Sequence, residues 1–191
     1  MLYKYRSLGD FRNFMDIVIN RRLWASEYQK LNDPMEGQYL DRYQSLSHEL
    51  IKALSGYKEN TRICSLSANP EDVVMWSLYA DGHQGVVVGV DIDINKYSVK
   101  PVFYTGLQEF PERVDYISTD TAIDILTHKL REWSYEREHR VFTHGSNFVY
   151  CSIRQLILGQ RVGSTNKSLI KKIVNKIDPR IEIVELNLMI I

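Results

Sequence analysis

The chain has 191 residues, the length of one domain, and its 44% hydrophobic and 25% charged residues are typical of globular proteins. This composition excludes disordered, collagen-like and coiled-coil classes. Its 24 Lys and Arg residues balance 24 Asp and Glu residues. The net charge of zero removes the usual electrostatic argument for non-specific nucleic-acid binding, although it leaves room for a local basic patch.

Hydrophobic periodicity and turn-forming residues divide the first half of the chain into strands and helices. Apolar residues at alternate positions indicate strands, and apolar residues three and four apart indicate helices. The predicted elements are a strand over 2–6, a helix over 11–19, a strand over 22–28, a turn at Asn32-Asp33-Pro34, a helix over 39–54, a strand over 61–67, a helix over 71–80 and a strand over 84–92. The last strand is β-branched and apolar, which suits a central strand buried on both faces.

The second half continues the mixed pattern. The predicted elements are a strand over 99–105, a helix over 119–130, strands over 138–143 and 148–158, a helix over 168–177 and a closing strand over 180–191. No repeat, low-complexity segment or linker divides the chain. Because strands and helices mix without a regular βαβ period, we predict an α+β fold in which a mixed β-sheet core carries packed helices, as a single domain over residues 1–191.

Cysteine usage and hydropathy bear on location. Cys64 and Cys151 are too few for a disulfide framework or a complete cysteine-based zinc site, and both are expected to be buried thiols rather than reactive nucleophiles. The opening residues hold no apolar signal core, and no apolar run approaches the roughly 20 residues that span a bilayer. We therefore expect a cytoplasmic protein with no membrane partner.

Two short stretches near the start of the chain combine polar and charged residues. In the strand Tyr3-Lys4-Tyr5-Arg6, alternation places the cations Lys4 and Arg6 on one face and the two tyrosines on the other. This stretch is equally consistent with an edge strand that carries solvated charges. The stretch Asn32-Asp33-Pro34-Met35-Glu36 has the composition of a structural turn.

A third stretch runs from Met75 to Gly85 and pairs two aromatic rings on one helix. Trp76 and Tyr79 are three apart, so they share a face of the predicted helix, which leads into a glycine-bounded turn. Rings at this spacing usually belong to a core. Two large rings with polar tips would also suit the floor of a pocket for a flat ring or a nucleotide.

The fourth stretch, from Trp133 to Arg140, is the densest. If residues 135–142 form a strand, Glu136, Glu138 and Arg140 lie side by side on one face. Repulsion between the two carboxylates raises at least one pKa unless a cation such as Arg140 or Lys4 compensates. The alternative is a solvated ladder of ion pairs.

Established chemical motifs are missing from the sequence. It contains no phosphate-binding GxxxxGK[ST] loop, no GxGxxG, no HExxH, no CxxC and no GxSxG. The five histidines lack metal-ligand spacing, so we expect no metal site. His83 and His139 are of interest because each lies inside one of the stretches above.

The order of these stretches carries a resemblance. LYKYRSL, LWAS…LNDPMEG, MWSLYADGHQGVVVGVD, W-x-YE-x-EHR and the ILG at 157–159 together resemble a widespread bacterial family of unknown function, over nearly the whole chain. A more distant likeness is to the DarT-like branch of the ADP-ribosyltransferases. That likeness implies an ADP-ribosyltransferase-like fold and NAD as the substrate, which is split between nicotinamide and ribose so that ADP-ribose passes to a protein or nucleic acid.

The resemblance also implies roles for particular residues. The opening strand of that family carries a His or Arg that holds the NAD ribose. Here Lys4, Tyr5 or Arg6 would stand there, a departure from the commoner His form. The family's late strand carries a Glu, often in Glu-x-Glu, which matches Glu136-Arg137-Glu138. The implied catalytic residues are Glu138 and, for activation of the acceptor, Glu136, and the implied NAD-binding residues are Lys4, Tyr5, Arg6, Trp76, Tyr79, Tyr135 and Arg140.

Three functions follow as hypotheses. The first is an NAD-dependent mono-ADP-ribosyltransferase that acts as a toxin or phage-defence effector, with an antitoxin as its partner. The second is a non-catalytic module that binds a nucleotide or a single-stranded nucleic acid through its aromatic and cationic residues. The third is a metal-independent nuclease or hydrolase built on Glu136, Glu138 and His139. Incubation with NAD distinguishes the three.

Overall fold

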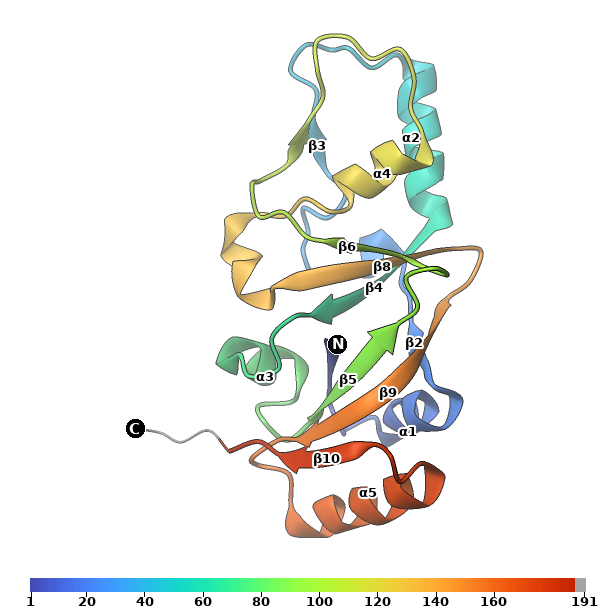
Figure 1. The fold of residues 1–191 in the computed structure, drawn as a ribbon. Coiled ribbons are helices and arrows are strands. Elements are labelled where there is room, and N and C mark those ends of the chain that lie inside the picture. Colours follow the sequence, from blue (N-terminus) through green and yellow to red (C-terminus); the bar gives the residue numbers. More distant parts are fainter. Residues whose placement is uncertain (188–191) are drawn as a thin grey trace.

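The computed structural model describes residues 1–187 (Figure 1). In chain order its elements are β1 (Leu2–Arg6), α1 (Phe11–Asn20), β2 (Arg22–Trp24), η1 (Tyr28–Lys30), β3 (Tyr39–Leu40), α2 (His48–Asn60), β4 (Thr61–Ser67), α3 (Val73–Tyr79), β5 (Val86–Ile92), β6 (Ser98–Pro101), β7 (Gln108–Glu109), α4 (Thr119–Ile125), η2 (Arg131–Glu136), β8 (Glu138–His144), β9 (Phe148–Leu158), α5 (Ser164–Ile177) and β10 (Glu182–Glu185), where η marks a 3₁₀-helix.

A sheet of eight strands forms the centre of the fold. Its order is β10-β9-β5-β1-β4-β8-β6, with β2 added to β9. The β10–β9 pair is parallel, and the other pairs of this sheet are antiparallel. The prediction of an α+β fold with a mixed sheet and packed helices is therefore confirmed, with a sheet that is mostly antiparallel.

The sheet is split between its two central strands. β1 pairs with β5 along its whole length, from Leu2 to Arg6, but it pairs with β4 only where Tyr3 faces Ser67. β4 continues along β8 instead, from Thr61 to Ser67. The later part of β1 and the earlier part of β4 therefore diverge, and a cleft opens between them.

The two faces of the sheet are covered by different helices. α1 and α5 pack on one face, where Val18 and Val174 meet the β5 residues Val86, Val88 and Val90. On the other face α3 packs against Tyr5, Val87 and Ile157. This arrangement follows from β5, which is apolar on both sides and so takes a helical layer on each.

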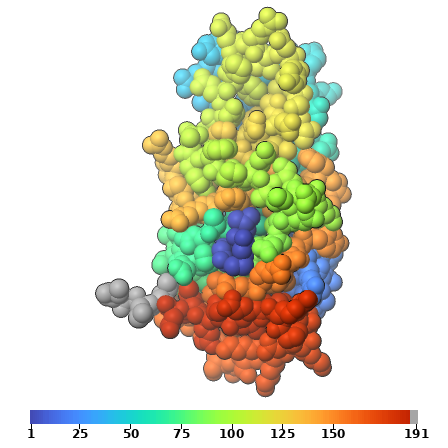
Figure 2. Space-filling view, in the orientation of Figure 1, coloured from blue at the N-terminus to red at the C-terminus, as the bar shows by residue number. Residues whose placement is uncertain are grey.

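A smaller layer lies beyond the β8 and β6 edge of the sheet. α2 and α4 pack there with the short parallel pair β3–β7, around Leu54, Phe110 and Ile125 (Figure 1). Leu126 and Phe142 connect this layer to the sheet. In space-filling view, the first residues of the chain reach the surface near the middle of the molecule, with later segments around them (Figure 2).

Several predicted boundaries are wrong for local reasons. Residues 39–54 do not form one helix, because the Asp41 carboxylate accepts hydrogen bonds from the backbone N–H groups of Ser45 and Leu46 and closes a turn. The helix starts only after Ser47, whose hydroxyl caps the N–H of Leu50. The predicted strand at 22–28 ends at residue 24, and the helix predicted at 119–130 ends at residue 125. The strand predicted at 99–105 begins one residue earlier and is shorter, because β6 spans Ser98–Pro101.

The stretch around Glu136 also differs from its prediction. Residues 131–136 form a 3₁₀-helix, Arg137 adopts a left-handed conformation with φ 42°, and the strand begins only at Glu138. The predicted helix at 168–177 begins earlier, at Ser164. Of the closing strand predicted over 180–191, β10 covers 182–185, and residues 188–191 lie outside the described part. Between residues 1 and 187, each helix is too short or too polar to cross a bilayer.

Candidate functional site

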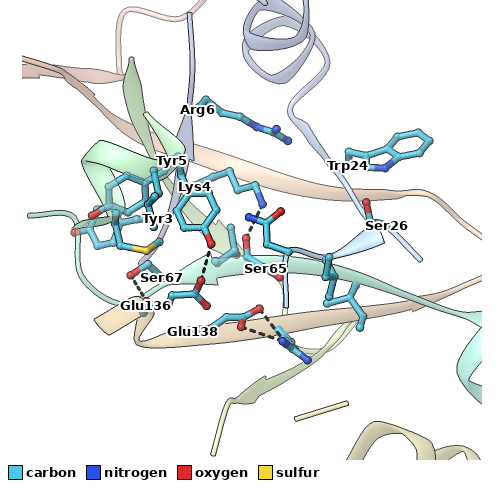
Figure 3. A pocket seen from close by; sticks show the side chains of 18 of the residues that line it. Tyr3, Lys4, Tyr5, Arg6, Trp24, Ser26, Ser65, Ser67, Glu136 and Glu138 are labelled. Carbon is cyan, nitrogen blue, oxygen red and sulfur yellow. Dashed lines mark hydrogen bonds and ion pairs between the residues drawn. The ribbon is translucent and has the colours of Figure 1, made fainter. Parts of the chain in front are cut away.

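A cavity of about 430 Å³ occupies the split in the sheet, within the range of about 300–1,000 Å³ that is common for ligand pockets. Its walls come from β1, β4, β8, α3 and the segments around residues 24–32 and 129–136. Of the residues predicted to form a site, those that line it are Lys4, Tyr5, Arg6, Tyr79, Glu136, Glu138 and Arg140 (Figure 3).

Two predicted binding residues lie outside this lining. Trp76 is fully buried, donates its ring N–H to the Pro70 carbonyl oxygen at 2.8 Å, and contacts the Tyr5 ring edge-to-face. Tyr135 packs against the same apolar cluster and next to Trp133. Trp76 has no exposed ring surface for a ligand, so its proposed stacking role is corrected to a core role, and Tyr135 is a neighbour of the site rather than part of its wall.

Glu138 is the first residue of β8 and is held by two cations. Tyr3, Ser67 and Glu138 are successive partners across the sheet, and the Glu138 side chain lines the cleft. Its carboxylate accepts hydrogen bonds from Arg140 at 2.9 and 3.0 Å and from Lys129 at 3.3 Å. Burial alone would raise its pKa, but the two cations outweigh that effect and lower the pKa to about 2. Glu138 is therefore ionised at neutral pH.

Glu136 lies beside it in a different electrostatic environment. Lys129 approaches its carboxylate at 2.5 Å, and the Tyr79 hydroxyl donates to it at 2.7 Å. Burial and the neighbouring Glu138 charge raise its pKa despite these donors. The two carboxylates thus have pKa values that are pushed in opposite directions, an arrangement that lets one stay charged while the other exchanges a proton.

The left-handed residue Arg137 explains how the two carboxylates meet outside one continuous strand. The φ of 42° at Arg137 turns the chain between η2 and β8, and Lys129 contacts both carboxylates. The Ser67 hydroxyl donates to the Glu136 carbonyl oxygen at 2.7 Å and fixes this turn to β4. The predicted strand at this point was wrong, but the side chains converge as expected.

Arg140 holds carboxylates rather than facing the ligand with free donors. It is fully buried, and its guanidinium donates to Glu138, to both oxygens of Glu36 and to the Leu126 carbonyl oxygen. Glu36 comes from the turn at 32–36, where the Asp33 carboxylate accepts from the Met35 N–H at 2.9 Å. The turn is confirmed, and its Glu36, which the sequence analysis interpreted only as part of a turn, holds Arg140 from behind the cavity lining.

The cations of β1 reach the cleft through the split. As predicted, Tyr3 and Tyr5 share one face and pack with the α3 cluster. Lys4 and Arg6 point the other way, and the Lys4 ammonium donates to the Ser65 carbonyl oxygen across the gap at 2.8 Å (Figure 3). The Nε of Arg6 is buried and has no hydrogen-bond partner among residues 1–187. Burial lowers the pKa of both groups.

Other lining residues were missed by the sequence analysis. They include Ser65 and Ser67 of β4, Lys129, Trp24, Ser26 and Lys30, together with Asn32, which was interpreted only as part of a turn. The two serines had a signal, because they alternate with the apolar residues Cys64 and Leu66 on a predicted strand and so share a face. Lys129 had none, since nothing near it in the sequence indicates that two carboxylates surround it.

Within residues 1–187, no group of three or more His, Cys, Asp or Glu side chains is arranged to hold a metal ion. His139 neighbours Glu138 on β8 and therefore points to the opposite face of the sheet. Comparison with protein-family models, with curated proteins and with solved structures finds no match.

Proposed function

We propose that the cleft binds NAD and that this protein is a mono-ADP-ribosyltransferase whose fold is of the ADP-ribosyltransferase type. The observation that carries the proposal is the pair of unlike carboxylates, Glu138 and Glu136, in one cavity with the cations Lys4 and Arg6. A dinucleotide needs both features: a negative charge at the ribose that reacts and positive charge at the two phosphates.

The chemistry assigns one role to each carboxylate. When the bond between nicotinamide and ribose breaks, the electron pair leaves with nicotinamide, and the ribose becomes an oxocarbenium-like cation. The ionised Glu138 stabilises that cation more than it stabilises the neutral ribose before reaction. A nucleophilic oxygen or nitrogen of the acceptor then bonds to the ribose carbon and gives its proton to Glu136, whose raised pKa suits a base.

The remaining lining residues would position the substrate. The buried Nε–H of Arg6, which has no partner among residues 1–187, is suited to donate a hydrogen bond to a phosphate oxygen of the substrate. Lys4 adds a second cation on the same strand. Tyr79 is fixed by its bond to Glu136 and offers a ring beside the reacting end of the cleft.

One observation favours a second candidate, a module that binds a nucleotide without cleaving it. Both oxygens of Glu138 already accept hydrogen bonds from Arg140, which would weaken their effect on a ribose cation. The third candidate, a nuclease or hydrolase that uses His139, is not proposed, because on β8 that side chain points to the opposite face of the sheet from Glu138.

The Glu138→Gln variant tests the proposal. It keeps the shape of the side chain and removes its charge, so release of nicotinamide from NAD is expected to fall by about 100-fold or more, roughly 3 kcal/mol in the barrier. The matched control is Glu182→Gln, an exposed position on β10 outside the cavity. Wild-type turnover in the Glu138 variant would contradict the assignment, and saturable binding of NAD without release would support the binding module.

The biological part of the proposal is an effector that acts as a toxin or in phage defence, in the cytoplasm, on a protein or nucleic-acid acceptor and under the control of an antitoxin. Induced expression in bacteria is expected to stop growth with the wild-type chain and with Glu182→Gln, but not with Glu138→Gln. Equal growth of all three strains at equal protein levels would contradict an effector role.

A further inference from the structure

The cleft has a second end that the chemistry above does not use. Trp24, the last residue of β2, lines the cavity with Ser26, Lys30 and Asn32, whereas Glu136 and Tyr79 line it next to α3. In Figure 3 Trp24 and Ser26 lie on one side of the view, Tyr3 and Glu136 lie on the other, and the Arg6 side chain extends between them. The cavity therefore has an acidic end, formed by Glu136 and Glu138, and a second end, formed by Trp24 and Lys30.

Trp24 combines exposure with a fixed position. Its side chain is 48% exposed although it lines the cavity, while its neighbour Leu23 is fully buried and anchors β2. The Trp24 ring meets the Phe148 ring edge-to-face, with centroids 5.3 Å apart, because the two residues are paired across β2 and β9. An aromatic ring that is exposed yet locked by packing loses little entropy when a ligand stacks on it.

The support behind Trp24 continues through a second layer. The Arg22 guanidinium lies 3.8 Å from the centre of the Phe148 ring and is itself held by Asp16 at 2.9 Å. These contacts bind no ligand, but they keep the Phe148 ring in place and so keep Trp24 at the mouth of the cleft.

Arg6 lies between the two ends. It is on the strand that forms one wall of the split, and its buried Nε lacks a hydrogen-bond partner among residues 1–187. An unpaired buried donor is costly, and a phosphate oxygen would satisfy it. A ligand that places a phosphate here and a sugar at Glu138 extends its remaining part toward Trp24.

We propose that Trp24 is the stacking platform for the adenine base of the dinucleotide, with Arg6 holding the phosphates between the adenine and the reacting ribose. This inference rests on the proposed function for the direction in which the substrate lies. It adds that recognition of the adenine half is separate from the reacting end and depends on a residue of β2.

Binding of the two halves of the substrate tests the inference. ADP contains the adenine and two phosphates, and nicotinamide mononucleotide contains the reacting half. By calorimetric titration, Trp24→Ala is expected to weaken ADP binding by about 10-fold or more, the usual loss when an aromatic ring under a base is removed, and to leave the mononucleotide within about twofold. Trp24→Phe should keep most of the ADP affinity because it keeps an aromatic face.

The control is Tyr116→Ala, an aromatic residue that is 77% exposed and does not line the cavity. Unchanged ADP affinity in Trp24→Ala, equal weakening of both halves, or a wild-type chain that binds no ADP would overturn the inference. If the wild-type chain binds ADP through Trp24 but releases no nicotinamide from NAD, the proposed function fails and the adenine site stands. If NAD is cleaved and Trp24→Ala leaves the KM for NAD unchanged, the adenine site fails and the proposed function stands.

Discussion

Replacement of Arg140 by methionine is the sharpest test of the charge network in the cleft. The guanidinium is fully buried and joins Glu36 to Glu138, so the Arg140→Met variant leaves two buried carboxylates without their common partner. Breaking a buried pair on one side costs about 3–5 kcal/mol. Because Glu138 keeps Lys129 at 3.3 Å, the loss should lie near the lower end, about 3 kcal/mol.

The loss should depend on pH, with a sign that follows from the pKa values. In the wild-type chain the folded pKa of Glu138 is about 2, below the value of about 4.3 for an unfolded glutamate, so its ionised form stabilises the fold above about pH 4.3 and that contribution is lost as the pH falls toward 2. Without Arg140, we expect burial to outweigh the remaining effect of Lys129 and to raise the folded pKa of Glu138 above the unfolded one, and we expect the pKa of Glu36, which burial already raises, to rise further. The variant is then penalised most at high pH and regains stability as the pH falls.

Urea denaturation at pH 8 and pH 5 measures both effects. In a thermal unfolding experiment on a chain of this length, the same loss of about 3 kcal/mol would lower the melting temperature by about 6–12 °C. The control, Arg154→Met, removes an exposed ion pair with Asp91 and should change stability by less than about 1 kcal/mol. A deficit of the same size at both pH values, or one as small as that of the control, would refute the reasoning.

Two further predictions concern the proton acceptor and the packing of β1. Tyr79→Phe removes a hydrogen-bond donor that lowers the pKa of Glu136, so the pKa of Glu136 should rise in the variant. The acidic limb of the pH profile for nicotinamide release should therefore move to higher pH, and an unmoved limb would contradict the proposed role of Glu136 as a base. Gly85→Ala would place a Cβ 2.2 Å from the Arg6 carbonyl oxygen and should destabilise the fold by about 3 kcal/mol. The control, Gly56→Ala, lies in open space on α2 and should stabilise the fold by about 0.5–1 kcal/mol. Thermal unfolding measures both variants, and similar values for the two would be inconsistent with close packing at Gly85.

Much of the fold was predictable because its strands have strong local patterns. β1, β4 and β9 follow their predicted ranges closely, since alternating or wholly apolar residues leave few other structures open to them. The first part of the helix predicted over 39–54 is wrong, because the Asp41 side chain accepts hydrogen bonds from two backbone N–H groups and closes a turn. Hydrophobic periodicity carries no information about such a hydrogen bond.

The site was predictable in content but not in layout. The residue types at Glu136 and Glu138 suggested chemistry, and both line the cavity. What holds them was beyond a local pattern: Glu36 reaches Arg140 across 104 residues of chain, and Lys129 has no distinctive neighbours. Trp76 was misassigned because a helix that fills a core and a helix that floors a pocket share the same aromatic spacing.

The central position of β1 has a consequence for biosynthesis. β1 is synthesised well before both of its partners, since Tyr3 pairs with Ser67 and Leu2 with Val90. Until β4 and β5 have emerged, β1 is an unpaired edge, and a chaperone or a neighbouring nascent chain can compete for it. Both carboxylates are translated later still. A ribosome that stalls before residue 136 therefore yields a fragment that carries Lys4 and Arg6 but neither carboxylate of the cleft, so the charge network around Arg140 cannot form in it.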